Sequence, residues 1–520
     1  MRRALTGNGP ASGAVIALWL VVLLIMPLRD AFEIGRDEGF EVVKSFQFSG
    51  PPEWRAQMWN DQPVGYTWLV TGLFRLFGPD VLVARLAGLA FSCLLLYSLL
   101  RLLPEESGWL PRLAVAGALL SYPHTAELSC SGMLEMPALA LGMFAIALLP
   151  AEARDQTRWV AFVLPGLLFG LACVIKFTAM FAAPWGLARL WMSFSPAMGE
   201  PPAAANAKAV LLQRLRAAGF VAAAFGVTLW LWFTLVEGES PVDRLLASHA
   251  KSAIYLGRQG GSAHAFPEDE VVSNLWLLPF VLALIIGWRD PALRRAGWPA
   301  VIGLVATYLV HLVHRPWWYF YHLHFAIPLA FIGGLGVQAA EKLLQPRGFS
   351  ADWLPWRRGS VQLLLLAAVL ILTAPEARRE LDQVLQSSRA KDDPLLVEFK
   401  QRAKDARWCF TRLRMTAFRA KVPIIPELAI LPYKRFWTGA INEKTIVQTV
   451  AKRLPDLLLL TVAGELSEPE WKTLVHEQYW LAYDNGDAAI YVCKKFKSPE
   501  PPVRIQSLRE ELGLPTAGEQ

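Results

Sequence analysis

Long apolar runs alternate with polar loops over the first 375 residues of this 520-residue chain. Eleven of these runs predict transmembrane helices. Several are shorter than the ~20 residues that a helix needs to cross the hydrocarbon of a bilayer, so we expect their ends to extend into the flanks. The runs lie at 14–28, 81–100, 113–123, 134–150, 159–175, 177–194, 217–236, 273–287, 298–313, 322–340 and 360–374. The pattern predicts a mainly α-helical membrane protein.

One further apolar stretch, Val64 to Phe77, does not fit a crossing. It is short, follows Pro63, contains Arg75 and stops at Gly78. We interpret it as an amphipathic helix that lies in the outer interface of the membrane. This interpretation decides which side of the membrane every later loop faces.

The loops between the runs differ in their content of basic residues. With Arg2 and Arg3 in the cytoplasm, the loops on the same side carry Lys and Arg at about twice the density of the opposite loops, as the positive-inside rule requires. The first run ends at Leu28-Arg29-Asp30, without the small residues of a cleavage site, so we expect an uncleaved first span. The sequence predicts a multi-pass protein of the bacterial inner membrane with a cytoplasmic N-terminus.

Residues 376–520 have the composition of a soluble domain. Of these 145 residues 43 are charged, about 30%, against 52 of 375, about 14%, in residues 1–375; soluble domains have about 25%. The sequence predicts a charged helix at 376–389, strands at 408–410, 457–462 and 488–492, and a helix at 470–480. We therefore expect a transmembrane domain, 1–375, and a small periplasmic α/β domain, 376–520.

Several functions are excluded by what the sequence lacks. The net charge of +7 is too diffuse to indicate nucleic-acid binding. No nucleotide-binding glycine loop, CxxC pair or HExxH helix is present, so neither nucleotide binding nor structural zinc is predicted. Cys409 and Cys493 are candidates for a disulfide if their domain faces an oxidising compartment, and the sequence leaves this open.

The first outward loop contains adjacent acidic residues. Asp37 and Glu38 follow the first span closely, and Asp61 precedes Pro63. Such acids are costly near lipid unless they face water or a polar cavity. A carboxylate there can serve as the general base for an acceptor hydroxyl or amine, or as a metal ligand. The alternative is a solvated loop with ordinary acids.

Two charged residues lie at the ends of later spans. Glu135 opens one, where the helix N-terminus favours an anion, so it is either a capping acid or part of a site. Lys176 separates two apolar runs on the outer side, where the positive-inside rule disfavours a cation. It either extends to the interface or meets an anion such as a phosphate.

The last outward turn, His311 to His324, holds four histidines and one arginine, Arg315. Arginine binds phosphate through two hydrogen bonds, and histidine can donate to it. Trp317 and Trp318 are typical of an interfacial aromatic belt. Metal binding by the histidines is a weaker alternative, because no spacing here specifies it.

Taken in order, these motifs resemble the GT-C glycosyltransferases, in the branch of the protein O-mannosyltransferases and the aminoarabinose transferase of lipid A. The resemblance covers nearly the whole chain. It rests on Arg36-Asp37-Glu38-Gly39, Asp61-Gln62-Pro63-Val64-Gly65-Tyr66, Ala84-Arg85-Leu86-Ala87-Gly88, Met133-Leu134-Glu135-Met136-Pro137, Lys176 and the Arg315 to His322 turn. It implies a GT-C type helix bundle with juxtamembrane helices on the outer face.

The resemblance also implies roles for single residues. Asp37 is expected to be the catalytic acid-base residue and Glu38 its companion. Asp61 and Glu135 are expected to hold the acceptor or a divalent metal, with Asp37 and Glu135 as the candidate metal ligands. The donor phosphate is expected to meet Lys176, Arg315, His314, Tyr321 and His322. A divalent metal is the one cofactor that the resemblance leaves open.

The chain departs from the family in two places. It has Pro63-Val64 where the family often has two prolines, and it lacks the β-trefoil insertion of the eukaryotic protein mannosyltransferases. Protein mannosylation of the eukaryotic kind is therefore disfavoured.

The predicted function is that of an integral membrane glycosyltransferase. It takes a sugar from a polyprenyl-phosphate-sugar donor, and the acceptor is a periplasmic lipid, glycan or protein. The alternatives are a transporter or flippase of lipid-linked sugars, which should carry polar or broken helices near the middle of the bilayer, and a non-catalytic membrane scaffold, which has no need of Asp37, Glu38 and Lys176 on one face.

Overall fold

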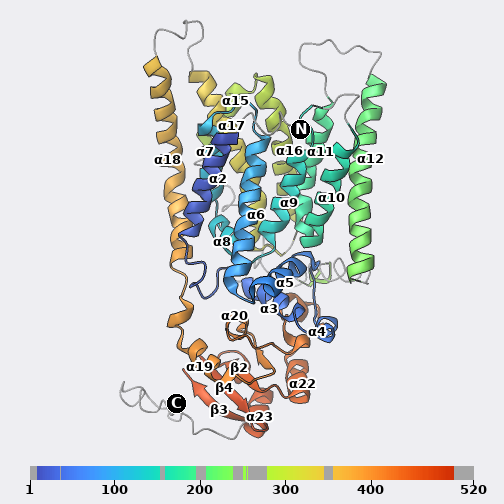
Figure 1. The fold of residues 1–520 in the computed structure, drawn as a ribbon, viewed down its shortest axis with the longest axis vertical. Helices are drawn as coiled ribbons and strands as arrows, with labels where there is room; N and C mark the ends of the chain where they lie inside the picture. Colours follow the sequence, from blue (N-terminus) through green and yellow to red (C-terminus); the bar gives the residue numbers. More distant parts are fainter. Residues whose placement is uncertain are drawn as a thin grey trace. The chain divides into compact units, whose positions relative to one another are not determined.

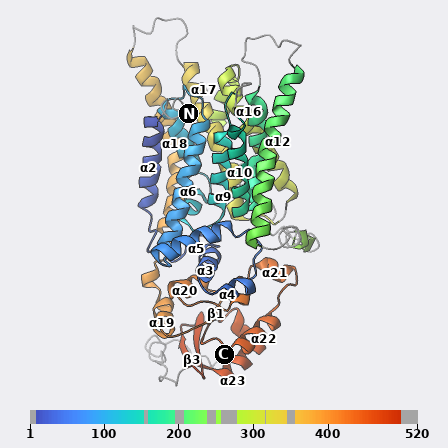
Figure 2. The same cartoon turned by 45° about the vertical axis from the view of Figure 1, so that its right-hand side comes forward.

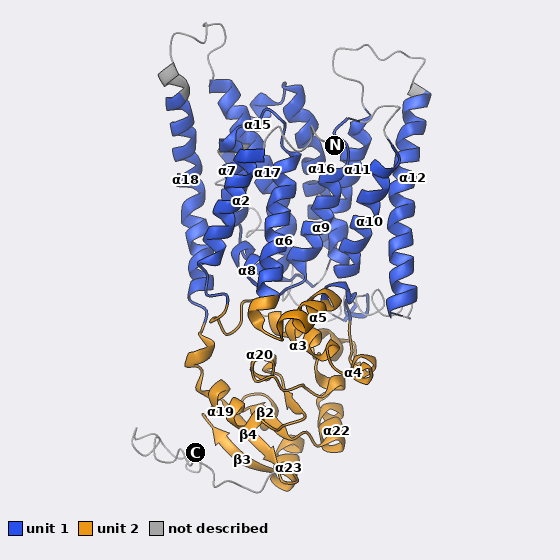
Figure 3. Ribbon diagram, in the orientation of Figure 1, with its two compact units in different colours: residues 1–28, 61–66, 84–387 blue, residues 29–60, 67–83, 388–520 orange. Residues whose placement is uncertain are grey.

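The computed structural model describes most of the chain. The described residues are 9–35, 37–152, 158–194, 207–237, 250–252, 254–255, 278–314, 316–344 and 355–496. The chain divides into two compact units (Figure 3). Unit 1 comprises residues 1–28, 61–66 and 84–387, and unit 2 comprises residues 29–60, 67–83 and 388–520. The predicted domains, 1–375 and 376–520, stay a prediction.

Unit 1 is a bundle of helices, many of which run side by side in both Figure 1 and Figure 2. Its helices are α2 (Gly9–Leu24), α6 (Val81–Leu102), α7 (Trp109–Leu120), α8 (Thr125–Cys130), α9 (Glu135–Leu148), α10 (Val160–Ile175), α11 (Ala183–Ser193), α12 (Ala207–Trp232), α15 (Leu278–Gly287), α16 (Pro291–Val313), α17 (His322–Leu344) and α18 (Pro355–Leu385). The short segments η1 (Phe177–Ala182) and η6 (Tyr319–Tyr321) connect some of them, and η3 (Phe233–Glu237) continues α12. Each of the eleven predicted apolar runs overlaps one of these α-helices.

Five of the described helical segments are long and apolar enough to cross a membrane, judged by length and composition. They are Val81–Leu102, Lys208–Glu237, Pro291–Val313, Tyr319–Leu344 and Gly359–Leu385. Four shorter apolar helices, α2, α7, α9 and α10, accompany them. Large apolar side chains such as Ile285 and Ile371 are exposed on this bundle, and lipid rather than water suits such surfaces. The chain is a multi-pass membrane protein; its number of spans and its orientation stay predictions.

Small residues let some of these helices approach closely. Gly166 and Gly170 lie four residues apart on α10 and face α12, where a Cβ at either position would collide with Val221 or Thr228. Helices in lipid associate through such close packing, because lipid provides no hydrophobic driving force between them. The two glycines therefore set the distance between α10 and α12.

Helix α18 runs through Pro375 and ends at Leu385. The charged helix predicted at 376–389 is helical over 376–385, where its residues form the last part of this 31-residue helix, and the predicted end at 389 is four residues too late. Proline removes one backbone hydrogen bond, and an α-helix can continue past this loss.

Unit 2 surrounds a four-stranded sheet. Its helices are α3 (Glu38–Phe48), α4 (Pro52–Gln57), α19 (Pro394–Ala403), α20 (Arg414–Arg419), α21 (Tyr433–Trp437), α22 (Glu443–Arg453) and α23 (Pro469–Gln478), with most of α5 (Gly65–Phe77). The strands are β1 (Cys409–Thr411), β2 (Leu457–Thr461), β3 (Tyr479–Asp484) and β4 (Ala488–Cys493). Their order is β1-β2-β4-β3, with β1 and β2 parallel and the other pairs antiparallel.

The centre of this sheet is apolar. The four leucines that begin β2, Leu457–Leu460, are all buried, and Phe410 of β1 stacks on the buried Trp471 of α23 with ring centroids 5.1 Å apart. Burial of so many large side chains is the main stabilising contribution available to such a small sheet. Cys409 and Cys493 are both buried and free, and β2 separates their strands in the sheet.

Strands β1, β2 and β4 lie at the three apolar runs that predicted strands. The helix predicted at 470–480 ends at Gln478, because Tyr479 begins β3. In the edge strand β3, two adjacent residues, Trp480 and Leu481, are both exposed. The strand therefore lacks the strict alternation of apolar and polar residues from which a strand is predicted. Its pairing with β4, a tertiary contact, makes it a strand.

Candidate functional site

The acidic motif of the first outward loop begins α3. Asp37 takes the N-cap position, and its side chain caps no backbone N–H group. Glu38 is buried, and its Oε2 accepts a hydrogen bond from the Ile34 N–H at 2.8 Å. A second hydrogen bond runs in the opposite direction along the chain: Glu33, which precedes the helix, accepts through its Oε1 from the Gly39 N–H of the helix at 3.0 Å. Two carboxylates thus brace the loop that presents Asp37.

Gly39 is closely packed at the same place. A Cβ on this residue would lie 3.0 Å from Glu33 Oε1, 3.2 Å from the Cβ of Arg414 and 3.3 Å from the Cγ of Met415. With a larger residue here, these neighbouring side chains would have to give by a few tenths of an ångström. Close packing within unit 2 therefore explains why the acidic motif has a glycine at this position.

Glu33 is a member of this group that the sequence analysis missed. Burial, followed by the negative charge of Glu38, raises the pKa of Glu33 from 4.5 to about 7. The Gly39 N–H and the charge of Arg414 act in the opposite direction. The only signal in the sequence was an acid that follows Ala31-Phe32, close to the apolar span. Glu33, Asp37 and Glu38 are called the acidic cluster below.

A buried lysine of α3, Lys44, joins this helix to the segment that follows it. The Nζ of Lys44 donates to Glu41 Oε1 at 2.7 Å and to Asn60 Oδ1 at 3.2 Å, and the Lys44 side chain is 2% exposed. Asn60 immediately precedes Asp61 in the sequence. The lysine therefore ties α3 to the residue that leads into the second motif.

The second motif, Asp61 to Tyr66, belongs to unit 1 and packs against the end of α10. A Cβ on Gly65 would lie 2.7 Å from the backbone oxygen of Val174, so only glycine fits there. The Val64 N–H donates to Glu237 Oε1 at 3.1 Å. Glu237, which the sequence analysis did not select, anchors this motif.

The third motif, Ala84 to Gly88, also has a structural explanation. The buried Arg85 donates from Nη1 to the Leu28 carbonyl at 2.8 Å. Gly88 lies against the backbone of Ser131, where a Cβ would collide with the Ser131 oxygen. This motif therefore holds α6 against the segment that follows α2 and the segment that precedes α9.

Glu135 and Lys176 form one buried ion pair. Glu135 is the first residue of α9, and Lys176 lies in extended conformation between α10 and η1. The two residues are 1% and 7% exposed, and Lys176 Nζ contacts Glu135 Oε1. The ammonium also lies 4.2 Å from the ring centroid of Phe320. Residues expected in separate roles are therefore direct partners.

Three other candidates for the donor phosphate lie in the turn around η6. His314 follows α16, and its ring centroid is 5.8 Å from that of Tyr321, a buried residue. The carboxylate of Asp61 lies close enough to Tyr321 to interact with it electrostatically. Arg315 lies outside the described residues. The structure thus brings Asp61 near the aromatic turn.

His322, the third of these candidates, is buried at the start of α17. Its ring centroid is 5.6 Å from that of His124. His124 adopts a positive φ of 62°, and its Nδ1 lies 3.0 Å from Glu127 Oε2. The His124 N–H also donates to Glu380 Oε2 at 2.6 Å, which connects this turn to α18.

A second pair of histidines joins α16 to α17. His311 Nε2 lies 3.1 Å from His324 Nδ1, and the ring of Phe181 stacks on both, at centroid distances of 4.6 and 4.2 Å. Both histidines are buried. The stack holds two helices and η1 together next to the Lys176 backbone.

The candidate metal ligands do not form a metal site. Among the described residues, no group of three or more His, Cys, Asp or Glu side chains is arranged to hold a metal ion. Glu135 contacts the ammonium of Lys176, and a carboxylate paired with a cation in this way does not fit a bound divalent metal.

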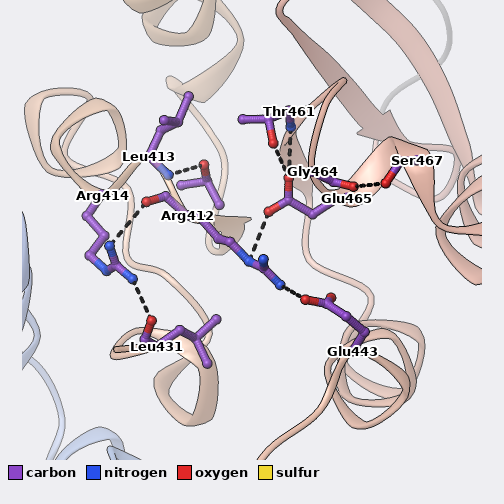
Figure 4. Close-up of polar contacts among 10 residues, drawn as sticks. Arg412, Leu413, Arg414, Leu431, Glu443, Thr461, Gly464, Glu465 and Ser467 are labelled. Carbon is purple, nitrogen blue, oxygen red and sulfur yellow. Dashed lines mark hydrogen bonds and ion pairs between the residues drawn. The ribbon is translucent and has the colours of Figure 1, made fainter. Parts of the chain in front are cut away.

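The carboxyl ends of β1 and β2 carry a polar cluster (Figure 4). Arg412 lies between two acids: its Nε is 3.1 Å from Glu465 Oε1, and its Nη2 contacts Glu443. The other oxygen of Glu465 accepts from the N–H and the hydroxyl of Thr461. The buried charge of Glu465 is thereby neutralised and hydrogen-bonded, as a buried carboxylate requires.

Comparison with solved structures shows with which proteins this chain shares its fold. ArnT from Cupriavidus metallidurans bound to undecaprenyl phosphate matches with a TM-score of 0.61 and 15% identity, over 94% of this chain and 99% of that chain. Apo ArnT from the same organism matches with a TM-score of 0.59 and 14% identity, over 94% and 98%. Neither a family model nor a curated protein matches the chain.

A second kind of glycosyltransferase shares the architecture. The Archaeoglobus fulgidus oligosaccharyltransferase, tethered with an acceptor peptide, matches with a TM-score of 0.53 and 10% identity, over 94% of this chain and 74% of that chain. At these identities the likeness is one of fold. The chain has the GT-C fold, and the resemblance seen in the sequence motifs is confirmed.

Proposed function

We propose that this protein is a membrane glycosyltransferase that moves a sugar from a polyprenyl-phosphate-sugar donor to a lipid, glycan or protein acceptor outside the cytoplasm. The observation that carries the proposal is the GT-C fold over 94% of the chain, shared with a protein whose structure contains undecaprenyl phosphate. The acidic motif and the buried lysine agree with the chemistry of such a transfer.

In this proposal Lys176 holds the donor phosphate, together with Arg315, His314, Tyr321 and His322. A cation stabilises the negative charge that develops on the phosphate when the sugar leaves. Because Lys176 is paired with Glu135, a phosphate has to share the ammonium or displace the carboxylate. Glu135 therefore weakens phosphate binding while it keeps Lys176 charged and oriented.

Asp37 acts as the general base, and Glu38 supports it. The acceptor hydroxyl or amine transfers its proton to the Asp37 carboxylate and forms a bond to the anomeric carbon. The bond from that carbon to the phosphate oxygen breaks, and its electron pair remains on the phosphate. Attack opposite the leaving group inverts the anomeric centre. Asp61 and Glu135 are proposed to orient the acceptor.

The proposed setting is a bacterial inner membrane, with the N-terminus in the cytoplasm and residues 376–520 in the periplasm. The basic residues of the predicted cytoplasmic loops support this orientation. A polyprenyl-linked donor and a periplasmic acceptor are both accessible from the outer leaflet.

Mass spectrometry of envelope lipids, glycans and proteins tests the proposal, in cells with and without this chain. We expect one sugar modification to disappear on deletion and to return with the parent chain. Asp37→Asn, expressed at the same level, should not restore it. An envelope that is identical with and without the chain would contradict the proposal.

A further inference from the structure

Two arginines of unit 1 meet at the end of one helix. Arg101 of α6 donates from Nε to the Ala147 carbonyl at 3.1 Å, and Arg189 of α11 donates from Nη2 to the Leu149 carbonyl at 3.2 Å. Ala147 and Leu149 lie in the last turn and at the C-cap of α9. The carbonyls at a helix C-terminus carry partial negative charge and attract cations. Arg101 and Arg189 therefore lie close together, and we call them the arginine pair.

Acidic side chains do not compensate the arginine pair. Within the described part of the chain neither Arg101 nor Arg189 has an ion-pair partner, and the charge that acts on Arg189 is that of Arg101. The end of a helix contributes about half an elementary charge, which offsets only part of two full positive charges. A net positive charge therefore remains at this place.

The arginine pair also keeps N–H groups for a ligand. A guanidinium has five N–H groups. Arg189 uses one of them, and its Nε is buried without a hydrogen-bond partner among the described residues. Arg101 uses its Nε and its Nη1, the second of which reaches the Tyr97 hydroxyl at 3.4 Å. Both arginine side chains are only half-buried, so an anion can reach them and supply the missing acceptors.

Apolar and aromatic side chains are exposed at the same end of the bundle. A buried apolar cluster packs the end of α9 against the end of α11 and the starts of α10 and α12. At this end Leu187 and Trp191 of α11 and Leu215 of α12 are exposed. The guanidinium of Arg214, on α12, lies 4.5 Å from the ring centroid of Trp191. Tryptophan and arginine beside exposed aliphatic side chains are typical of the level of the lipid headgroups.

We propose that the arginine pair binds the phosphate group of an anionic phospholipid of the bilayer. The planar guanidinium matches the oxygens of a phosphate and binds them through two parallel hydrogen bonds. Basic pockets between transmembrane helices on the cytoplasmic side bind such headgroups. The loops at this end are those predicted to be cytoplasmic, and the exposed apolar side chains of α11 and α12 provide a surface for the acyl chains.

This lipid site is separate from the proposed site of sugar transfer. Lys176 follows the last residue of α10, whereas the start of α10 packs beside the arginine pair. A helix of 16 residues separates its two ends by about 24 Å. The inference therefore goes beyond the proposed function and does not depend on it.

The test is the thermal unfolding midpoint of the purified full chain in phosphatidylcholine nanodiscs with and without phosphatidylglycerol. We expect phosphatidylglycerol to raise the midpoint of the parent, because a ligand that binds the folded state stabilises it. Native mass spectrometry measures the phosphatidylglycerol that each protein retains. Its affinity should fall about tenfold in Arg101→Gln and in Arg189→Gln, since each loses one charged contact.

Arg295→Gln is the matched control. It removes an arginine from the same predicted side of the membrane, but one whose Nη1 lies 2.9 Å from Glu152 Oε1, and it should leave phosphatidylglycerol binding unchanged. An equal loss in this control would indicate a general effect of surface charge and overturn the proposal.

The parent alone also decides the matter if the arginine variants do not fold. A midpoint that phosphatidylglycerol does not raise overturns the proposal, as does parent-like lipid binding by Arg101→Gln and Arg189→Gln. Inorganic phosphate, added to phosphatidylcholine nanodiscs, should not raise the midpoint; an equal rise would reject a lipid in favour of a free anion. None of these measurements needs a sugar donor, so a failure of the proposed function leaves their outcome unchanged.

Discussion

At the scale of single residues, Lys176 and Glu135 neutralise each other in the interior of unit 1. A phosphate at Lys176 competes with Glu135, so Glu135→Gln should bind undecaprenyl phosphate more tightly, by about tenfold for a ~1.4 kcal/mol change. Lys176→Met should bind it more weakly, because a charged hydrogen bond contributes about 1.5–3 kcal/mol. Titration of the purified protein with undecaprenyl phosphate measures both.

The single substitution Lys176→Met needs a control, since it leaves a buried carboxylate without its cation. Such a loss costs about 3–5 kcal/mol of stability. The double variant Glu135→Gln/Lys176→Met removes both charges and should regain thermal stability while its phosphate affinity stays low. If the double variant binds as tightly as the parent, Lys176 has no part in phosphate binding.

Substitutions of Asp37 and Glu38 should distinguish a catalytic role from a structural role in the loop. Asp37→Asn removes the proton acceptor and should lower turnover by about 10²–10⁴-fold with little change in donor affinity. Glu38→Gln should have a milder effect, because a glutamine oxygen can still accept from the Ile34 N–H. Single-turnover transfer in nanodiscs, with donor binding measured in parallel, distinguishes the two. Parent-like transfer by Asp37→Asn removes the proposed base.

Glu33 should make stability depend on pH. Its folded pKa of about 7 lies above the ordinary value of 4.5, so its contribution to stability is fully present below about pH 4.5 and is lost as the pH rises through about 7. Glu33→Gln removes this dependence and should be more stable than the parent at pH 8 by roughly 1–3 kcal/mol. Thermal unfolding of both proteins between pH 4.5 and 8 measures the difference, and parallel curves would exclude it.

At the scale of elements, the start of α5 is fixed by contact with the end of α10. Gly65→Ala should destabilise the protein by about 1–3 kcal/mol, because the new methyl group meets the Val174 backbone at 2.7 Å. Gly72→Ala, in the same helix, is the matched control: no atom lies within 4 Å of its Cβ position, so a gain of ~0.5–1 kcal/mol in helix propensity is expected. Thermal unfolding in detergent compares them. Equal stability of the two variants would contradict the close contact.

At the scale of the whole molecule, the distribution of basic residues among the loops predicts which side of the membrane each end of the chain faces. A phosphatase reporter fused after Ser387, two residues beyond the end of α18, should be active, whereas a reporter that needs the cytoplasm should not. The same two reporters at the N-terminus should give the opposite result. An inactive phosphatase at Ser387 would place the C-terminal segment in the cytoplasm and separate it from a periplasmic acceptor.

The helices of unit 1 and the GT-C fold were predictable from the sequence by itself. A chain in lipid has to satisfy its backbone hydrogen bonds internally, so each apolar run folds as a helix whatever its neighbours are. The short motifs, in their order, indicated the fold through their resemblance to a known family, because they contain residues that close approaches in the fold require, such as Gly65 at Val174. The positions of β1, β2 and β4 followed from apolar runs in the same way.

Only the tertiary structure decided which charged residues are partners. Glu135 and Lys176 are 41 residues apart and pair because α9 and the end of α10 are packed together. Glu33, missed in the sequence, joins Asp37 through Gly39 and Arg414, and β3 becomes a strand by pairing with β4. The physical reason is the same in each case. Hydropathy acts on one residue at a time, whereas the state of a buried charge or an edge strand depends on the groups that the fold brings against it.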